Sequence, residues 1–240
     1  SAARGQNGLL LPHIHTLCDL YDDAPDKEAA FLAMSDVPPA IQPMARHYHL
    51  LTLIRAWAAM AGAAQVGGEG ALNPVKLSAL AFDLERFLDQ AQNEDLDWTK
   101  LPDLAPDELA ENWQQTLDFL KIITEFWPQI LDDLGMVDPT ARRNTLLRLR
   151  REAWAANPPT HPVIAAGSTG SIRATADLLA LVTSLPRGSV VLPGLDMEVD
   201  APHWRMIEKT VSHPQYALAQ LLTHMGVTRA QIATWPGSVP

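Results

Sequence analysis

One stretch of the sequence, from His161 to Asp196, constrains the fold of this chain more than any other. It contains two short apolar runs, at residues 163–166 and 190–192, separated by a glycine- and serine-rich turn and an amphipathic pattern over residues 172–185. The order strand, tight turn, helix, strand is typical of a βαβ unit with parallel strands. The stretch therefore predicts a parallel sheet within an α/β domain.

The turn inside this stretch consists of Gly167, Ser168, Thr169, Gly170 and Ser171. Turns of this kind present free backbone N–H groups at the start of a helix, where a phosphate or another anion can bind. This turn has neither the lysine of a phosphate-binding loop nor the spacing of a dinucleotide-binding loop, and no carboxylate follows before Asp177. We weigh a turn in which Ser168 or Thr169 caps the following helix above an active phosphate site, and keep a nucleotide- or phosphate-binding enzyme as the alternative.

A second candidate site is a group of arginines in a predicted helix that begins at Asp138-Pro139 and ends near Ala156. Guanidinium groups bind phosphates in a bidentate manner, so the group is a candidate for contacts with a DNA backbone. The competing interpretation is a solvated helix surface whose cations pair with nearby acids. The arginines of this group are Arg142, Arg143, Arg148, Arg150 and Arg151.

Composition and charge argue against several classes of protein. The 240 residues carry a net charge of −10, and residues 1–160 hold 23 acids against 13 bases, whereas the rest is balanced. This balance argues against a protein that grips nucleic acid along its whole surface. No apolar stretch approaches the ~18 residues of a membrane span, so no contact with a membrane is expected. The single cysteine, Cys18, is typical of a small buried residue in a reducing cytoplasm.

No motif predicts catalysis or metal binding. The pairs His13 with His15 and His47 with His49 lack the spacing and the accompanying carboxylate of a metal site. The alternating acids of residues 196–200 are more often a polar loop than a cation site. We therefore expect no catalytic and no metal-binding residue.

The chain divides into three parts. Residues 1–22 contain an apolar run, residues 9–17, that predicts a first strand, and residues 23–157 read as a helical subdomain. Residues 158–240 return to strands and helices, with a possible last strand near residues 232–235. Because strands flank the helical part, the first strand is expected to join the later ones in one sheet. The predicted fold class is α/β with the helices inserted.

Prolines at the first turn mark the predicted helix starts in the middle part: Pro43, Pro74, Pro106 and Pro139. The helix from Pro106 to about Leu134 carries a broad apolar stripe, which is typical of a helix in the middle of a bundle. Pro128 is expected to kink it.

Several runs of the sequence carry a family resemblance: PVIAAGSTGSIRATADLLALV, LPRGSVVLPGLD, HPQYALAQLL and MGV, preceded by LLPHIHTL and ENWQQTLDFLKIITEFWP. They resemble the AddB subunits of bacterial AddAB-type helicase–nucleases, which repair double-strand breaks in DNA. The resemblance covers nearly the whole chain, and AAGSTGSI is its most specific motif. It implies a portion of the N-terminal helicase-like region of a longer protein. The implied fold is a RecA-like (P-loop helicase-like) parallel sheet core with a large inserted helical subdomain.

The resemblance also implies a part without a motor. In superfamily 1 helicases the strand that corresponds to residues 163–166 ends in an Asp-Glu pair that holds Mg²⁺ for ATP hydrolysis, and Gly167-Ser168-Thr169 stands there instead. The family's iron–sulfur cluster and nuclease Mg²⁺ belong to a C-terminal domain with four cysteines, so no cofactor is expected here.

The expected function is a non-catalytic, cytoplasmic module of double-strand break repair. It would contact single-stranded DNA through the arginines, or the AddA-type helicase–nuclease subunit, or both. A pure protein-interaction scaffold is a further alternative.

Overall fold

The computed structural model describes residues 14, 16–17, 36–60, 74–104 and 110–235 of the chain. Residues 1–37 and 38–240 form two compact units, and every element described below belongs to the second. Among the described residues, no helix has the length and apolar character needed to cross a bilayer.

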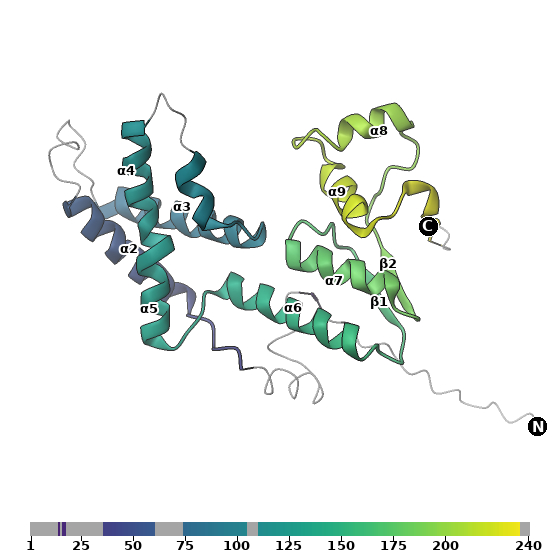
Figure 1. Cartoon of the computed structure of the whole chain (residues 1–240), viewed down its shortest axis with the longest axis horizontal. Coiled ribbons are helices and arrows are strands. Elements are labelled where there is room, and N and C mark those ends of the chain that lie inside the picture. Colours follow the sequence, from purple (N-terminus) through teal and green to yellow (C-terminus); the bar gives the residue numbers. More distant parts are fainter. Residues whose placement is uncertain (1–13, 15, 18–35, 61–73, 105–109, 236–240) are drawn as a thin grey trace, which may run out of the picture. The chain divides into compact units, whose positions relative to one another are not determined.

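The first elements of the second unit are all helical (Figure 1). They are α2 (Pro43–Met60), α3 (Pro74–Asn93), the 3-10 segment η1 (Trp98–Leu104), α4 (Ala110–Lys121), the π-helical turn η3 (Ile122–Phe126), α5 (Trp127–Leu134) and α6 (Pro139–Ala156). Strands and helices then alternate. These elements are β1 (Val163–Ala166), α7 (Arg173–Ser184), β2 (Gly188–Val191), α8 (Ala201–Ile207), α9 (Tyr216–Met225) and the 3-10 turn η4 (Arg229–Gln231).

Three of the predicted helix starts are confirmed, because Pro43, Pro74 and Pro139 each begin a helix. Proline costs nothing at this position, where the backbone N–H has no helical partner. Asp138 caps α6, since its Oδ1 accepts the backbone N–H of Thr140 at 3.2 Å. Signals of this kind depend only on residues within one helical turn, so the helix starts that they predict do not depend on the rest of the fold.

The long helix predicted over residues 106–134 consists of α4, η3 and α5 in the structure. Its predicted start at Pro106 lies outside the described residues. Pro128 has no N–H and its ring crowds the carbonyl of Thr124, four residues earlier, which lies in η3. The π-helical turn accommodates this interruption immediately before α5 begins.

Apolar side chains of α2, α3, α4, η3 and α5, with Ile41 just before α2, form the core of the helical part. The buried members are Ile41, Leu50, Ile54, Ala81, Leu84, Leu88, Leu120, Ile122, Ile123 and Trp127. Trp57 of α2 packs edge-on against Phe119 of α4, with the ring centroids 4.9 Å apart. The broad apolar stripe read from the sequence is therefore a packing surface rather than a platform for stacking bases.

The predicted βαβ unit is confirmed. β1 and β2 are parallel, in a register that pairs Val163 with Gly188. Helix α7 packs on one face of these strands, where Ala165 and Val190 contact a cluster that contains Leu179 of α7 and Leu221 of α9 (Figure 1). The right-handed crossover expected of parallel strands requires such a covering helix.

The predicted RecA-like core, in contrast, is wrong. The described residues contain one sheet of only two strands, and helices make up most of the fold. The last predicted strand, residues 232–235, forms no ladder, and its Ile232 instead packs against the cluster around Trp204. A four-residue apolar run cannot by itself distinguish a strand from a buried coil. The first predicted strand, residues 9–17, lies largely outside the described residues.

Candidate functional site

The first two arginines of the predicted DNA-binding group have partners inside the molecule. Arg142 donates from Nε to the backbone carbonyl of Pro38 at 3.0 Å. The guanidinium of Arg143 donates to the side-chain carbonyl of Asn144, at 3.3 Å from Nε and 3.1 Å from Nη2, and to that of Asn93. Since Asn93 ends α3 and Pro38 precedes α2, these bonds fix the start of α6 to two neighbouring segments.

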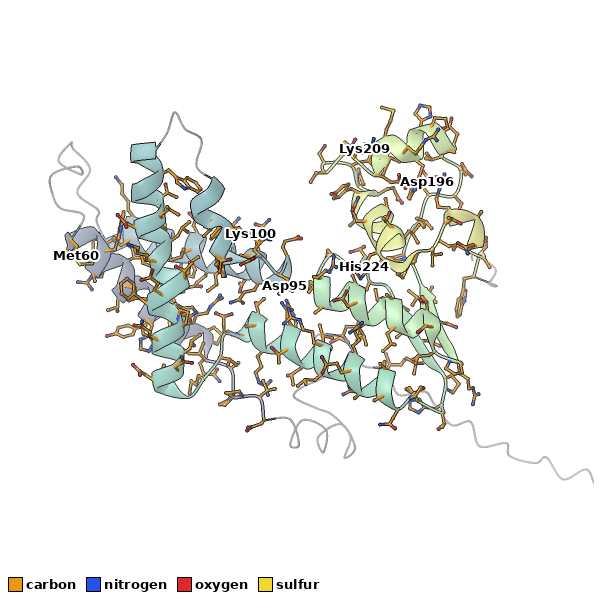
Figure 2. The ribbon with its side chains drawn as sticks, viewed as in Figure 1. Met60, Asp95, Lys100, Asp196, Lys209 and His224 are labelled. Atoms are coloured by element: carbon orange, nitrogen blue, oxygen red, sulfur yellow. The ribbon has the colours of Figure 1, made fainter. Side chains whose placement is uncertain are left out.

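In the C-terminal half of α6, Arg148 and Arg151 reach solvent, whereas the Nε of Arg150 is buried. Arg148 pairs with Asp95, labelled in Figure 2, at 2.7 Å, and the two side chains are 41% and 61% exposed. The guanidinium of Arg150 lies 5.5 Å from the centroid of the Trp154 ring, and Arg151 is exposed. An exposed ion pair contributes about 0–1 kcal/mol, so Arg148 can exchange its carboxylate for a phosphate at little cost. The accessible members of the cluster are thus Arg148 and Arg151.

The predicted anion loop, residues 167–171, is held by its glycines. Gly167 and Gly170 have φ of +80° and +64°, the left-handed region that favours glycine. Gly167 donates its N–H to the carbonyl of Val191 at 3.1 Å, and Gly170 donates to the hydroxyl of Ser168 at 3.2 Å. A Cβ on Gly170 would lie 2.5 Å from Cδ1 of Leu221, so the loop packs closely on α9.

The start of α7 has the free N–H groups of an anion site but unfavourable surroundings. The residue that precedes α7 is Ile172, whose side chain cannot cap it, so the predicted cap by Ser168 or Thr169 is wrong. A cavity of about 520 Å³ adjoins Ile172, and its charged lining residues are three acids, Asp83, Asp89 and Glu94, and one base, Arg86. The excess of carboxylates gives the lining a net negative charge, which disfavours a phosphate. The electrostatics therefore count against a phosphate-binding loop.

The nearest acid after β1 is engaged elsewhere. Asp177 Oδ1 lies 2.7 Å from Nε2 of His224, labelled on α9 in Figure 2, and 3.7 Å from Nε of Arg173. This contact ties α7 to α9 and leaves the end of β1 without a carboxylate. Among the described residues, no group of three or more His, Cys, Asp or Glu side chains can hold a metal ion.

Sequence reasoning missed a buried charge network between α2, α3 and α6. Arg46 of α2 pairs with Asp89 of α3 at 2.9 Å, and its Nε lies 2.9 Å from Oδ2 of Asp138. The second contact is an ion pair, in which Nε of Arg46 forms no hydrogen bond. Thr140 also donates to Asp89 at 2.8 Å. These residues lie up to 94 positions apart, so no local pattern signals the network.

His47, considered above only as one of a histidine pair, also has a structural role. Its Nδ1 lies 2.8 Å from Oε1 of Glu85, its Nε2 lies 3.2 Å from Oγ of Ser78, and its ring stacks on Phe82. The order serine, histidine, carboxylate is that of a nucleophilic triad. Both His47 and Glu85 are only 15% exposed, so their contact lies largely within the packed surface between α2 and α3. We interpret the group as a polar tie between α2 and α3.

Comparison of the chain with models of protein families, with curated proteins and with solved structures finds no match.

Proposed function

We propose that this chain is a non-catalytic module of a DNA double-strand break repair helicase–nuclease subunit, which works in the cytoplasm and contacts single-stranded DNA. The observation that carries the proposal is the accessible pair Arg148 and Arg151 on the C-terminal half of α6. It is joined by the resemblance to the AddB subunits. Arginine contacts with phosphates position a nucleic acid without reading its sequence, which suits a module that guides a strand.

The carboxylates near the end of β1 support a non-catalytic role. The loop after β1 contains no carboxylate, and Asp177 is engaged with His224 and Arg173. A metal-assisted hydrolysis needs carboxylates that hold the ion beside the reacting phosphate. The same features weaken the alternative of a nucleotide-binding enzyme that uses residues 167–171.

The net charge of −10 sets the expected strength of DNA binding. A chain with an acidic surface binds an anionic polymer only through a local basic patch, so binding should be weak and strongly dependent on salt. Each arginine–phosphate contact with a single strand contributes about 0.7 to the slope of log K against log salt concentration.

The experiment is a fluorescence-anisotropy titration of a labelled single strand at several salt concentrations. Replacing both arginines, Arg148→Gln with Arg151→Gln, should weaken binding by about tenfold and reduce the salt slope by about 1.4, because two contacts are lost. The matched control is Arg55→Gln with Arg205→Gln, two exposed arginines on α2 and α8 with the same change in charge. An equal loss in the control would show that only net charge matters, and would sink the proposal.

A protein-interaction scaffold is the second candidate function, because one face of the sheet is exposed. Ile164 of β1 is 60% exposed on the face opposite α7. Parallel strands are otherwise found almost only in sheets covered on both faces. This exposed strand supports a contact with a second protein, for which the AddA-type subunit implied by the sequence resemblance is the partner we propose.

Replacing Ile164 by serine tests this second function. The isolated chain should unfold at nearly the same urea concentration as the wild type, because the side chain is already exposed. Affinity for an AddA-type subunit, measured by interferometry, should fall by about tenfold, the loss expected for one well-packed apolar contact. Met60→Ser, at another exposed apolar position, serves as control. Unchanged affinity in Ile164→Ser would remove this face from consideration.

A further inference from the structure

A cavity of about 490 Å³ lies beside α8 and the segment that follows it. Its apolar wall comes from Val199, Met206 and Ile207, and none of its lining residues is lysine or arginine. Its volume falls within the range of pockets that bind small molecules or single side chains. Two histidines, two carboxylates and one hydroxyl form its polar wall.

Hydrogen bonds around Asp200 fix the tautomer of the first histidine. Oδ1 of Asp200 accepts the backbone N–H of His203 at 2.9 Å, and the ring Nδ1 of His203 lies 2.6 Å from the same oxygen. These bonds, the backbone one first, lower the pKa of Asp200, so the group is a carboxylate and the shared proton lies on Nδ1. When the ring is neutral, this tautomer leaves Nε2 of His203 as an acceptor.

The other polar groups of the wall can be assigned in the same way. Nδ1 of His213 accepts the backbone N–H of Gln215 at 3.1 Å, so its Nε2 carries the proton and donates. The hydroxyl of Thr210 donates to the carbonyl of Met206 at 2.7 Å and can only accept a further bond. The polar wall of the cavity thus has one donor, Nε2 of His213, and several acceptors. The acceptors that line the cavity are Glu198, Asp200, His203 and Thr210.

A cavity rich in acceptors and negative charge matches a ligand rich in donors and positive charge. The guanidinium of arginine has five N–H donors and no acceptor. A phosphate, in contrast, would be repelled by the two carboxylates. Exposed apolar side chains also lie at or next to lining residues in the sequence, since Met197, Met206 and Val211 are 47%, 65% and 76% exposed. Exposed methionine side chains adapt to partners of varied shape.

We propose that this cavity and its apolar rim bind an arginine-containing apolar peptide segment of a partner protein. The guanidinium lies against Glu198 and Asp200, and the flanking apolar side chains lie on Met206 and Val211. A peptide rather than a free cation is indicated because the exposed apolar side chains extend to residues outside the cavity lining. The cavity and its rim include no residue of α6 or β1. Peptide binding here can therefore be absent while the proposed function holds, and it can be present while the proposed function fails.

The test is a fluorescence-anisotropy titration of the intact chain with a fluorescein-labelled hexapeptide of alternating leucine and arginine. Saturable binding should weaken by about tenfold on Glu198→Gln and about fivefold on Met206→Ser, since each removes one of the two recognised features. A peptide with citrulline in place of arginine has nearly the same shape without the charge. It should bind at least about tenfold more weakly.

Glu152→Gln and Met44→Ser make the same chemical changes at exposed positions elsewhere, and both should bind the arginine peptide as the wild type does. Equal binding of the citrulline and arginine peptides would overturn the proposal. So would equal losses in the two control variants. If free benzamidine, an aromatic amidine, competes as strongly as the peptide, the cavity takes a small cation and the docking surface is refuted.

Discussion

Replacing Asp138 by alanine should lower the free energy of unfolding by about 3–5 kcal/mol, the cost of breaking a buried charge pair. The Asp138 side chain is 1% exposed, and its Oδ2 lies 2.9 Å from Nε of Arg46. The same carboxylate accepts the indole N–H of Trp127 at 3.3 Å and the backbone N–H of Thr140 at 3.2 Å. Alanine leaves these donors buried without an acceptor and removes the cap of α6.

The measurement is urea denaturation followed by tryptophan fluorescence, with Asp83→Ala as control. Asp83 pairs with Arg86 at 3.6 Å, and both side chains are largely exposed, so the control should unfold close to the wild type. A wild-type unfolding midpoint in Asp138→Ala would contradict the network that joins α2, α3 and α6.

The pH dependence provides a second check on the same residue. Burial, opposed by Arg46, raises the pKa of Asp138 above its ordinary value of 3.8. The folded chain therefore binds this proton more tightly than the unfolded chain. The contribution to stability is largest below pH 3.8 and is lost as the pH rises through the folded pKa. The Asp138→Asn variant cannot ionise at this position. As the pH rises through the folded pKa, the free energy of unfolding of the wild type should therefore fall relative to that of Asp138→Asn.

The elements that could be predicted from sequence are those with local causes. Pro139 and the cap at Asp138 place the start of α6, and the turn after β1 places α7, because each signal acts within a few residues. Helix α8 was missed, although Asp200 followed by Pro202 is a helix-start signal of the same kind. We predicted a polar loop at residues 196–200, which the structure has, but no element over residues 201–207.

The fold class and the roles of the individual arginines depend on contacts between residues far apart in the sequence. Sequence reasoning therefore predicted the wrong fold class, and it could not tell which arginines have partners inside the molecule. Whether Ile232 pairs in a sheet or packs against Trp204 depends on how two helices meet. Arg143 is engaged because Asn93, 50 positions earlier, lies beside it, whereas the side chain of Arg151 is exposed. A run of charges does not reveal which of its members the fold will use.

Replacing Gly188 by alanine should destabilise the βαβ unit by about 3 kcal/mol or more, because the added carbon meets backbone atoms. A Cβ on Gly188 would lie 1.9 Å from the carbonyl oxygen of Val182 and 3.0 Å from Cβ of Leu185. That carbonyl belongs to the last turn of α7 and accepts the N–H of Leu185 at 3.2 Å. To admit the methyl group, either this turn must unwind or Gly188 must leave its place opposite Val163 in the sheet.

Gly194→Ala is the matched control, because Gly194 has φ of +60° and nothing would lie within 4 Å of its Cβ. It should cost only the strain of a left-handed alanine, about 1 kcal/mol. Urea denaturation followed by circular dichroism compares the two variants. Hydrogen exchange then locates the effect, since the Val163 amide donates to the carbonyl of Arg187 and should lose protection only in Gly188→Ala. Equal stability and equal protection in the two variants would mean that α7 and β2 do not meet as closely as the structure places them.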